Sequence, residues 1–152
     1  MRKFLLVSLV LLLSFCWAGA AMADQAADAK ALVKSAIAMA KAQGLEAALK
    51  AAADPKGPFI KGDLYIFAGM ISKVQMTAHP YKPHLVGKDL SGMKDIKGKL
   101  FFNEFSSVAK DGGSAWVDYY WPKPGSKKPV LKSSYIEGLP GADAYFGCGV
   151  YK

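Results

Sequence analysis

Arginine is almost missing from this sequence, since Arg2 is its only representative among 152 residues. The formal net charge of +8 rests almost wholly on lysines, which are spread along the chain as at Lys34, Lys61 and Lys73. Lysine offers a point charge, whereas reading a base edge or clamping a phosphate favours the planar fork of arginine. The dispersed charge is therefore typical of a solubilising surface, and we expect no nucleic-acid partner.

Cysteine is also scarce, with Cys16 and Cys148 the only two in the chain. Cys16 lies in a segment that we expect to be removed, which leaves Cys148 without a disulfide partner. Cys148 falls inside an apolar run, a position typical of a buried thiol. His79 and His84 have no third ligand at a suitable spacing, and the sequence contains no Cys-x-x-Cys-His motif for covalent haem. We therefore expect neither a metal nor a cofactor.

Sequence motifs of catalysis are missing as well. There is no Gly-x-Ser-x-Gly elbow and no glycine-rich loop that leads into Lys-Ser or Lys-Thr. Gly147 and Gly149 flank Cys148 in an expected terminal strand, where they favour close approach of a neighbour over a phosphate cradle. We expect a binding or structural protein, with an enzyme as the third alternative.

Long apolar runs are confined to the first residues. A basic start at Met1-Arg2-Lys3 precedes an apolar segment from Phe4 to Trp17, and Ala21-Met22-Ala23 supplies a small-x-small pattern. This order predicts a signal peptide over residues 1–23 that is cut before Asp24. The mature domain, residues 24–152, is then expected in the periplasm or outside the cell.

Two alternatives to cleavage stay open. The apolar run is nearly long enough to remain as an uncleaved membrane anchor. The stretch Leu13-Ser14-Phe15-Cys16 vaguely resembles a lipobox, although the bulky Phe15 before the cysteine argues against a lipoprotein. No later segment is apolar enough to span a membrane, so we do not expect the mature domain to be a transmembrane receptor by itself.

The mature segment begins with a helix-forming stretch. Residues 25–53 are rich in alanine, lysine and leucine, and their apolar residues recur at helical spacing. Gly44 marks a break or kink, and Asp54-Pro55 ends the helix. A second, short amphipathic helix is expected over residues 100–110, with Phe101, Phe105 and Val108 on one side.

Strand-like segments fill much of the remaining chain on either side of a long loop. Residues 80–98 are rich in proline and glycine, so this loop is expected to be irregular. A long helix followed by about five antiparallel strands predicts an α+β fold. Strands are expected at residues 64–68, 73–78, 115–121, 130–136 and 145–151.

Short motifs follow one another at Pro55–Phe59, Lys61–Phe67, Ala78–Pro80 with Leu85–Leu90, Gly113–Pro122, Lys132–Tyr135 and Gly147–Lys152. In this order they resemble the single Cache domain of the second type, an extracellular bacterial sensor module related to the PAS fold. The resemblance implies a PAS-like α+β fold, with a long N-terminal helix packed on a roughly five-stranded antiparallel sheet. It also implies a small organic ligand, often a short carboxylate, and a part in signal transduction or chemotaxis.

The sequence departs from that family in two places. No membrane-spanning exit or signalling module follows Lys152, so we expect output through a separate membrane receptor or transporter partner. The stretch Met70-Ile71-Ser72-Lys73 lacks the Asp-Gly or Asn-Gly turn expected between the first two strands. The long N-terminal helix is a candidate surface for a homodimer.

Strand alternation divides the aromatic run at residues 115–121 between two faces. Tyr119 and Trp121 share one face, and Trp116 lies on the other. By the family's pattern, Tyr119 and Trp121 are expected to form the wall of a pocket, with Trp116 at its rim. The alternative is that all three rings are ordinary core.

The next strand contributes Lys132 and Tyr135 as candidate ligand-binding residues. Lys132 can neutralise a carboxylate and Tyr135 can donate a hydrogen bond, although Lys132 is equally consistent with a solvated strand. Regular alternation places them on opposite faces, so either a bulge joins them or only one serves the pocket. His79 either donates to a carboxylate or ties down the loop, and His84 is expected to be exposed.

These observations predict a sensor domain that binds a small organic anion between its sheet and the loop at residues 80–98. A structural or interaction module with a degenerate, ligand-free Cache fold is the alternative from another class. A completely filled core would favour that alternative. The candidate ligand-binding residues are His79, Trp116, Tyr119, Trp121, Lys132 and Tyr135.

Overall fold

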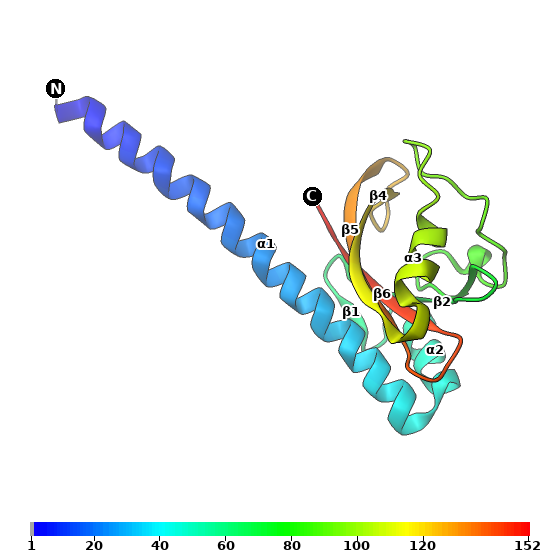
Figure 1. Cartoon of the computed structure of the whole chain (residues 1–152). Helices are drawn as coiled ribbons and strands as arrows, with labels where there is room; N and C mark the ends of the chain where they lie inside the picture. The colour runs from blue at the N-terminus through cyan, green and yellow to red at the C-terminus, as the bar shows by residue number, and fades with distance from the viewer. Residues whose placement is uncertain (1) are drawn as a thin grey trace.

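The computed structural model describes the backbone of residues 2–152 and the side chains of Met22 and of residues 24–152. Helix α1 (Arg2–Gln43) leads into a compact part that contains the remaining elements (Figure 1). The predicted signal peptide, residues 1–23, lies almost wholly outside the residues whose side chains are described, and its cleavage stays a prediction. Within the described part of the chain, no helix is both long and apolar enough to cross a membrane.

Gly44 separates the first two helices, so the predicted break is confirmed. Its φ of 94° lies in the left-handed region, which glycine adopts without the steric penalty of a Cβ. The chain turns at this residue, and α2 (Leu45–Ala53) packs beside the end of α1 (Figure 1). The buried residues of α2 are Ala48 and Ala52, whose small side chains fit a close helix contact.

One antiparallel sheet forms the centre of the compact part. Its strand order is β1-β2-β6-β5-β4, and β3 pairs with the edge of β2 that β1 also uses. The five strands expected from the sequence are confirmed with small changes at their ends, and the two-residue β1 is an addition. The bounds are β1 (Ile60–Lys61), β2 (Leu64–Met70), β3 (Gln75–Ala78), β4 (Ser114–Pro122), β5 (Pro129–Gly138) and β6 (Tyr145–Tyr151).

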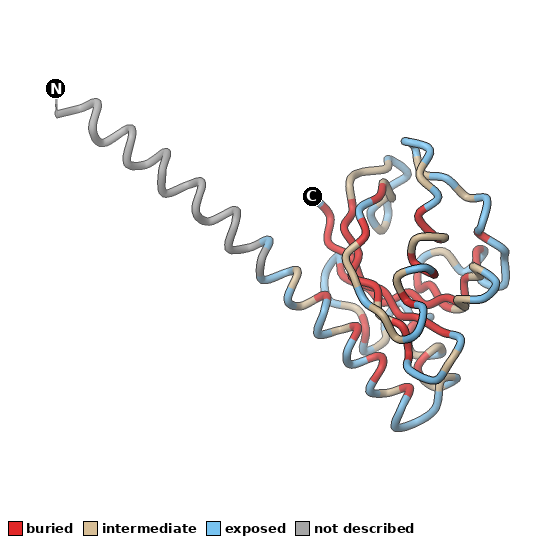
Figure 2. The backbone as a smooth tube through the Cα atoms, viewed as in Figure 1, coloured by how far each residue is buried: buried red, intermediate tan, exposed pale blue. Residues whose placement is uncertain are grey.

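The two faces of the sheet bury different sets of side chains. One face packs against α1 and α2, where Ile66, Phe146 and Cys148 meet helix residues such as Val33. The predicted burial of the Cys148 thiol is confirmed. The other face is covered by α3 (Phe101–Ala109) and by the loop that includes the short helix η1 (Pro83–Leu85) (Figures 1 and 2). The sheet is thus buried on both sides, and the second face can enclose a site.

The connection between β2 and β3 has no glycine, and Val74 within it adopts a φ of 47°. A β-branched residue in this region is unusual, so contacts outside the turn must hold it. The Ser72 amide donates to the Asp143 carboxylate at 2.8 Å, and the Ser72 hydroxyl donates to the same carboxylate. The Leu90 amide donates to the Val74 carbonyl at 2.9 Å. Tertiary hydrogen bonds therefore replace the turn signal that the sequence lacks.

Candidate ligand-binding cavity

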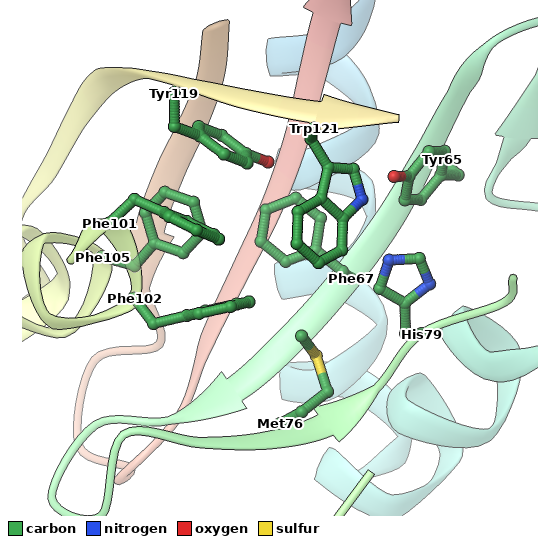
Figure 3. Close-up of a pocket in the computed structure, with 9 residues that line it drawn as sticks. All are labelled: Tyr65, Phe67, Met76, His79, Phe101, Phe102, Phe105, Tyr119 and Trp121. Atoms are coloured by element: carbon green, nitrogen blue, oxygen red, sulfur yellow. The ribbon is translucent and has the colours of Figure 1, made fainter. Parts of the chain in front are cut away.

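A small cavity lies between the sheet and α3, on the side of the sheet away from α1 (Figure 3). Its volume is about 10 Å³, close to the space that a single water molecule requires. Side chains from β2, β4 and α3, and from β3 and the residue just after it, converge on this cavity. The lining residues are Tyr65, Phe67, Met76, His79, Phe101, Phe102, Phe105, Tyr119 and Trp121.

Four of the six candidate residues come together at this cavity. His79, Tyr119 and Trp121 line it, and Lys132 approaches it from β5. The ammonium nitrogen of Lys132 lies 4.0 Å from the ring centroid of Tyr65 and 5.5 Å from that of Phe67, both of which belong to the wall. The placement agrees with the expected site, and the binding of a ligand by these residues stays a prediction.

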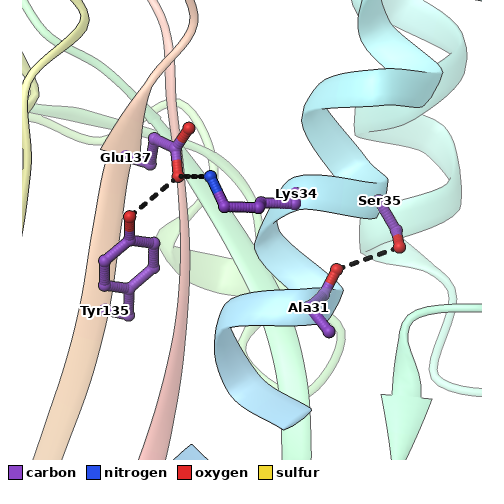
Figure 4. A network of polar contacts seen from close by, with 5 residues as sticks. All are labelled: Ala31, Lys34, Ser35, Tyr135 and Glu137. Atoms are coloured by element: carbon purple, nitrogen blue, oxygen red, sulfur yellow. Dashed lines mark hydrogen bonds and ion pairs between the residues drawn. The ribbon is translucent and has the colours of Figure 1, made fainter. Parts of the chain in front are cut away.

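Trp116 and Tyr135 lie on the opposite face of the sheet, against α1, and neither lines the cavity. The Lys30 ammonium lies 5.9 Å and 5.2 Å from their ring centroids. The Tyr135 hydroxyl donates to Glu137 at 3.0 Å, and Lys34 pairs with the same carboxylate oxygen at 3.4 Å (Figure 4). Because β4 and β5 pair along their whole length without a register shift, no bulge brings the tyrosine to the cavity side.

Lys132 is completely buried, with 0 % of its surface exposed. It belongs to none of the salt bridges found among the described residues. The faces of Tyr65, Phe67 and Tyr151 surround the nitrogen instead, with the Tyr151 centroid at 4.9 Å. Burial without a counter-charge lowers the pKa of the Lys132 ammonium from 10.5 to about 7.

The hydrogen bonds around Lys132 show how many of its N–H groups lack an acceptor. The Tyr151 hydroxyl donates to the Pro122 carbonyl at 3.0 Å, and a carbonyl can only accept. The Tyr65 hydroxyl, 3.3 Å from the Tyr151 hydroxyl, must then donate to it, and the Lys132 ammonium donates to Tyr65 at 2.9 Å. An ammonium has three N–H groups. Two of them therefore have no hydrogen-bond acceptor among the described residues.

His79 ties down the loop and keeps one donor for the cavity. It is 3 % exposed, and its Nδ1 accepts hydrogen bonds from the amides of Tyr81 and Lys82, each at 3.2 Å. An accepting Nδ1 leaves the proton on Nε2. Burial, followed by the positive charge of Lys132, lowers the pKa of His79 to about 3. Figure 3 shows the other ring nitrogen directed toward the space between Tyr65 and Trp121.

Several cavity residues were not among the candidates from the sequence. Tyr65 and Phe67 lie on one face of β2 by simple alternation, and Phe101 and Phe105 lie on the predicted apolar side of the short helix. These patterns identified buried faces but could not distinguish a cavity wall from ordinary core. The rings pack closely, as in the stacked pair of Phe101 and Tyr119, whose centroids are 4.4 Å apart.

Two glycines in β6 make room for the side chains behind the cavity. A Cβ on Gly149 would overlap Ser134 Oγ and lie 2.5 Å from Lys132 Cε. A Cβ on Gly147 would lie 2.5 Å from the ring of Phe67. The predicted close approach at these glycines is confirmed, and at Gly149 the neighbours include the buried lysine.

A larger depression of about 110 Å³ adjoins the cavity and shares Tyr65 and His79 with it. We call this depression the vestibule. Lys82 and Lys123 belong to its wall, and the Lys82 ammonium lies 5.2 Å from the ring centroid of Trp121. The vestibule is lined by Tyr65, His79, Tyr81, Lys82 and residues 122–126. Its two lysines give the vestibule a positive charge where it adjoins the cavity.

Known proteins are similar to this chain in sequence and in fold. The methyl-accepting chemotaxis protein McpP of Pseudomonas putida is 40% identical over 77 residues, which make up 51% of this chain and 14% of McpP. The chain therefore spans a small part of that relative's length. A solved periplasmic sensor domain of a chemotaxis protein is 34% identical, with a TM-score of 0.67 over 87% of this chain and 93% of that one.

A second solved structure is described as the structural basis for carboxylic acid recognition by a Cache chemosensory domain. It is 29% identical, with a TM-score of 0.71, and the likeness covers 88% of this chain and 97% of that one. The predicted α+β, PAS-like architecture and the periplasmic or extracellular location are confirmed by these relatives. The family model of single Cache domain 2 matches residues 21–152, and the chain belongs to that family of sensor domains.

Proposed function

We propose that this domain is a sensor that binds a short monocarboxylate beside Lys132. The observation that carries the proposal is a completely buried lysine with two unused N–H donors and no salt bridge among the described residues. A buried cation is costly unless an anion pairs with it. A carboxylate supplies one negative charge and two acceptor oxygens, which match the two free donors.

The wall of the cavity argues for a small ligand with one charge. Apart from Lys132 and the neutral His79, the side chains around it are aromatic or aliphatic, as at Phe101 and Phe105. A dicarboxylate would bury its second charge among these rings, and an amino acid would bury an ammonium without a carboxylate from the lining. Acids with two or three carbons fit this chemistry, and the 29% identical solved domain is described as one that recognises a carboxylic acid.

The size of the cavity requires the protein to move when a ligand binds. A volume of about 10 Å³ does not hold acetate, so rings of α3 or β4 must shift outward. The same small volume favours the second candidate function, a structural module that has lost its ligand. Lys132 argues against that module, because an apolar residue of similar length would occupy the position at lower cost.

We also propose how the domain signals. The domain with its ligand bound would act on a separate membrane receptor or transporter, and α1 offers a surface for a homodimer. Sedimentation of the mature domain, with and without acetate, tests the dimer. A monomer at every protein concentration would contradict it, and co-purification from membranes of the source bacterium tests the partner.

Titration calorimetry with acetate and propionate tests the proposed function. Succinate, alanine and ethylamine serve as ligands that the cavity should reject. We expect binding of the two monocarboxylates, and its loss in Lys132→Ala and Tyr119→Ala. Lys127→Ala, which removes an exposed lysine of the β4–β5 turn, is the matched control and should bind normally. Absence of binding, or equal binding by Lys132→Ala, would refute the assignment.

A further inference from the structure

The groups that surround Lys132 share one property: they keep the same charge across the neutral pH range. Burial raises the pKa of Tyr65 from β2 and of Tyr119 from β4 well above the ordinary value. From β6, burial raises the pKa values of Tyr151 and Cys148 to about 12. At the end of β3, burial and the charge of Lys132 lower the pKa of His79 to about 3.

Lys132 is therefore the group within this cluster that changes its charge near neutral pH. Lys82 and Lys123 line the adjoining vestibule and remain in contact with solvent. No carboxylate of the described residues faces the ammonium to hold its proton. An anion that enters the cavity would be the missing counter-charge.

Accordingly, we propose that the cavity takes up a carboxylate together with a proton, so that the domain reports the concentrations of anion and proton jointly. The inference rests on the proposed function and specifies what the site senses. In the empty protein the proton is held less tightly than on an exposed lysine, because the buried nitrogen has only the Tyr65 oxygen and aromatic faces around it. The complex prefers the ammonium because a carboxylate lies against it.

Linkage between the two equilibria sets the expected pH dependence. Below about pH 6.5 the lysine is mostly protonated before binding, since its pKa is about 7, and the affinity is nearly constant. At higher pH each binding event must first protonate the amine. The dissociation constant then rises about tenfold for every pH unit. An ordinary exposed lysine would give a constant affinity up to about pH 9.

Calorimetry of acetate binding between pH 6 and pH 9 tests the inference, with each pH measured in two buffers that both hold that pH. The two buffers differ in ionisation enthalpy, so the difference between the heats counts the protons taken up. We expect uptake close to zero at pH 6 and close to one at pH 8.5, with the affinity falling in parallel. His79→Gln should bind more weakly and keep the same pH slope, because His79 does not titrate in this range.

The outcomes separate this inference from the proposed function. Acetate binding with an affinity that is independent of pH, and with no proton uptake, would overturn the coupling and leave the carboxylate site intact. A slope that disappears in His79→Gln would overturn Lys132 as the proton acceptor. Absence of acetate binding at every pH would overturn the inference and the proposed function together.

Discussion

Replacing Lys132 by methionine should stabilise the empty domain while it destroys the binding site. Methionine has a similar length and no charge, so it can fill the space that Lys132 occupies beside the rings of Tyr65 and Tyr151. The lysine is buried at 0 % exposure, and the fold must either desolvate its charge or release its proton. The buried lysine therefore lowers the free energy of unfolding of the domain.

The magnitude follows from the shift in the pKa of Lys132, from 10.5 to about 7. One pKa unit corresponds to about 1.4 kcal/mol, so the lysine costs the fold roughly 4 kcal/mol at pH 7. The folded state binds the proton less tightly than the unfolded chain. The cost is therefore complete below about pH 7 and disappears as the pH rises toward 10.5.

Methionine removes that cost but leaves the Tyr65 hydroxyl without its donor, a loss of about 1 kcal/mol. We expect Lys132→Met to gain roughly 2–4 kcal/mol in the free energy of unfolding at pH 7. Near pH 10.5 the gain should vanish and leave a loss of about 1 kcal/mol or less, because the cost of the buried lysine has largely disappeared while the missing hydrogen bond to Tyr65 remains. Urea unfolding, followed by circular dichroism at the two pH values, measures the difference.

Lys127→Met provides the control, since Lys127 is exposed in the β4–β5 turn. Its free energy of unfolding should change by no more than about 0.5 kcal/mol at either pH. A Lys132→Met variant that is less stable than the parent at pH 7 would refute the reasoning. Such a result would mean that the buried lysine contributes to the stability of the fold.

Two further predictions concern neighbours of the lysine. Gly149→Ala would place a Cβ 2.5 Å from Lys132 Cε, so we expect a loss of roughly 1–3 kcal/mol in urea unfolding and much weaker acetate binding. Gly92→Ala, which has open space around it, should change neither, and equal effects of the two variants would contradict the steric argument. Burial lowers the pKa of His79 from 6.5 to about 3, so the folded domain keeps this histidine neutral. The unfolded chain takes up a proton there below about pH 6.5, so the free energy of unfolding falls as the pH drops below that value. Urea unfolding of His79→Gln should show a shallower loss between pH 6 and pH 4, and an unchanged loss would argue that the histidine is not buried.

Much of the fold was predictable because its signals are local. The break at Gly44 follows from glycine's freedom at positive φ, and the strands follow from alternation bounded by proline and glycine. Alternation also anticipated that Lys132 and Tyr135 face opposite sides of β5, which the continuous register confirms. The β2–β3 turn was less predictable, because the hydrogen bonds of Ser72 with Asp143 join residues that are distant in sequence.

The composition of the site was only partly predictable from the sequence. Tyr119 and Lys132 were identified through the family resemblance, whereas Tyr65 and Phe67 resembled ordinary core residues of a buried strand. Whether Lys132 would be solvated or buried depended on the rings and on the space that Gly149 leaves beside it. Cavity volume depends on how rings from separate elements interlock, and no short stretch of sequence contains that information.

The pKa of the Lys132 side chain, measured by NMR on lysine-labelled protein, tests the central claim most directly. Its signal is assigned by its absence from Lys132→Met, and it is followed through a pH titration without ligand and with saturating acetate. The account predicts a pKa near 7 in the empty domain and a rise when acetate binds. A pKa near 10.5 in the empty domain, unchanged by acetate, would show that Lys132 is neither an isolated buried cation nor the partner of a carboxylate.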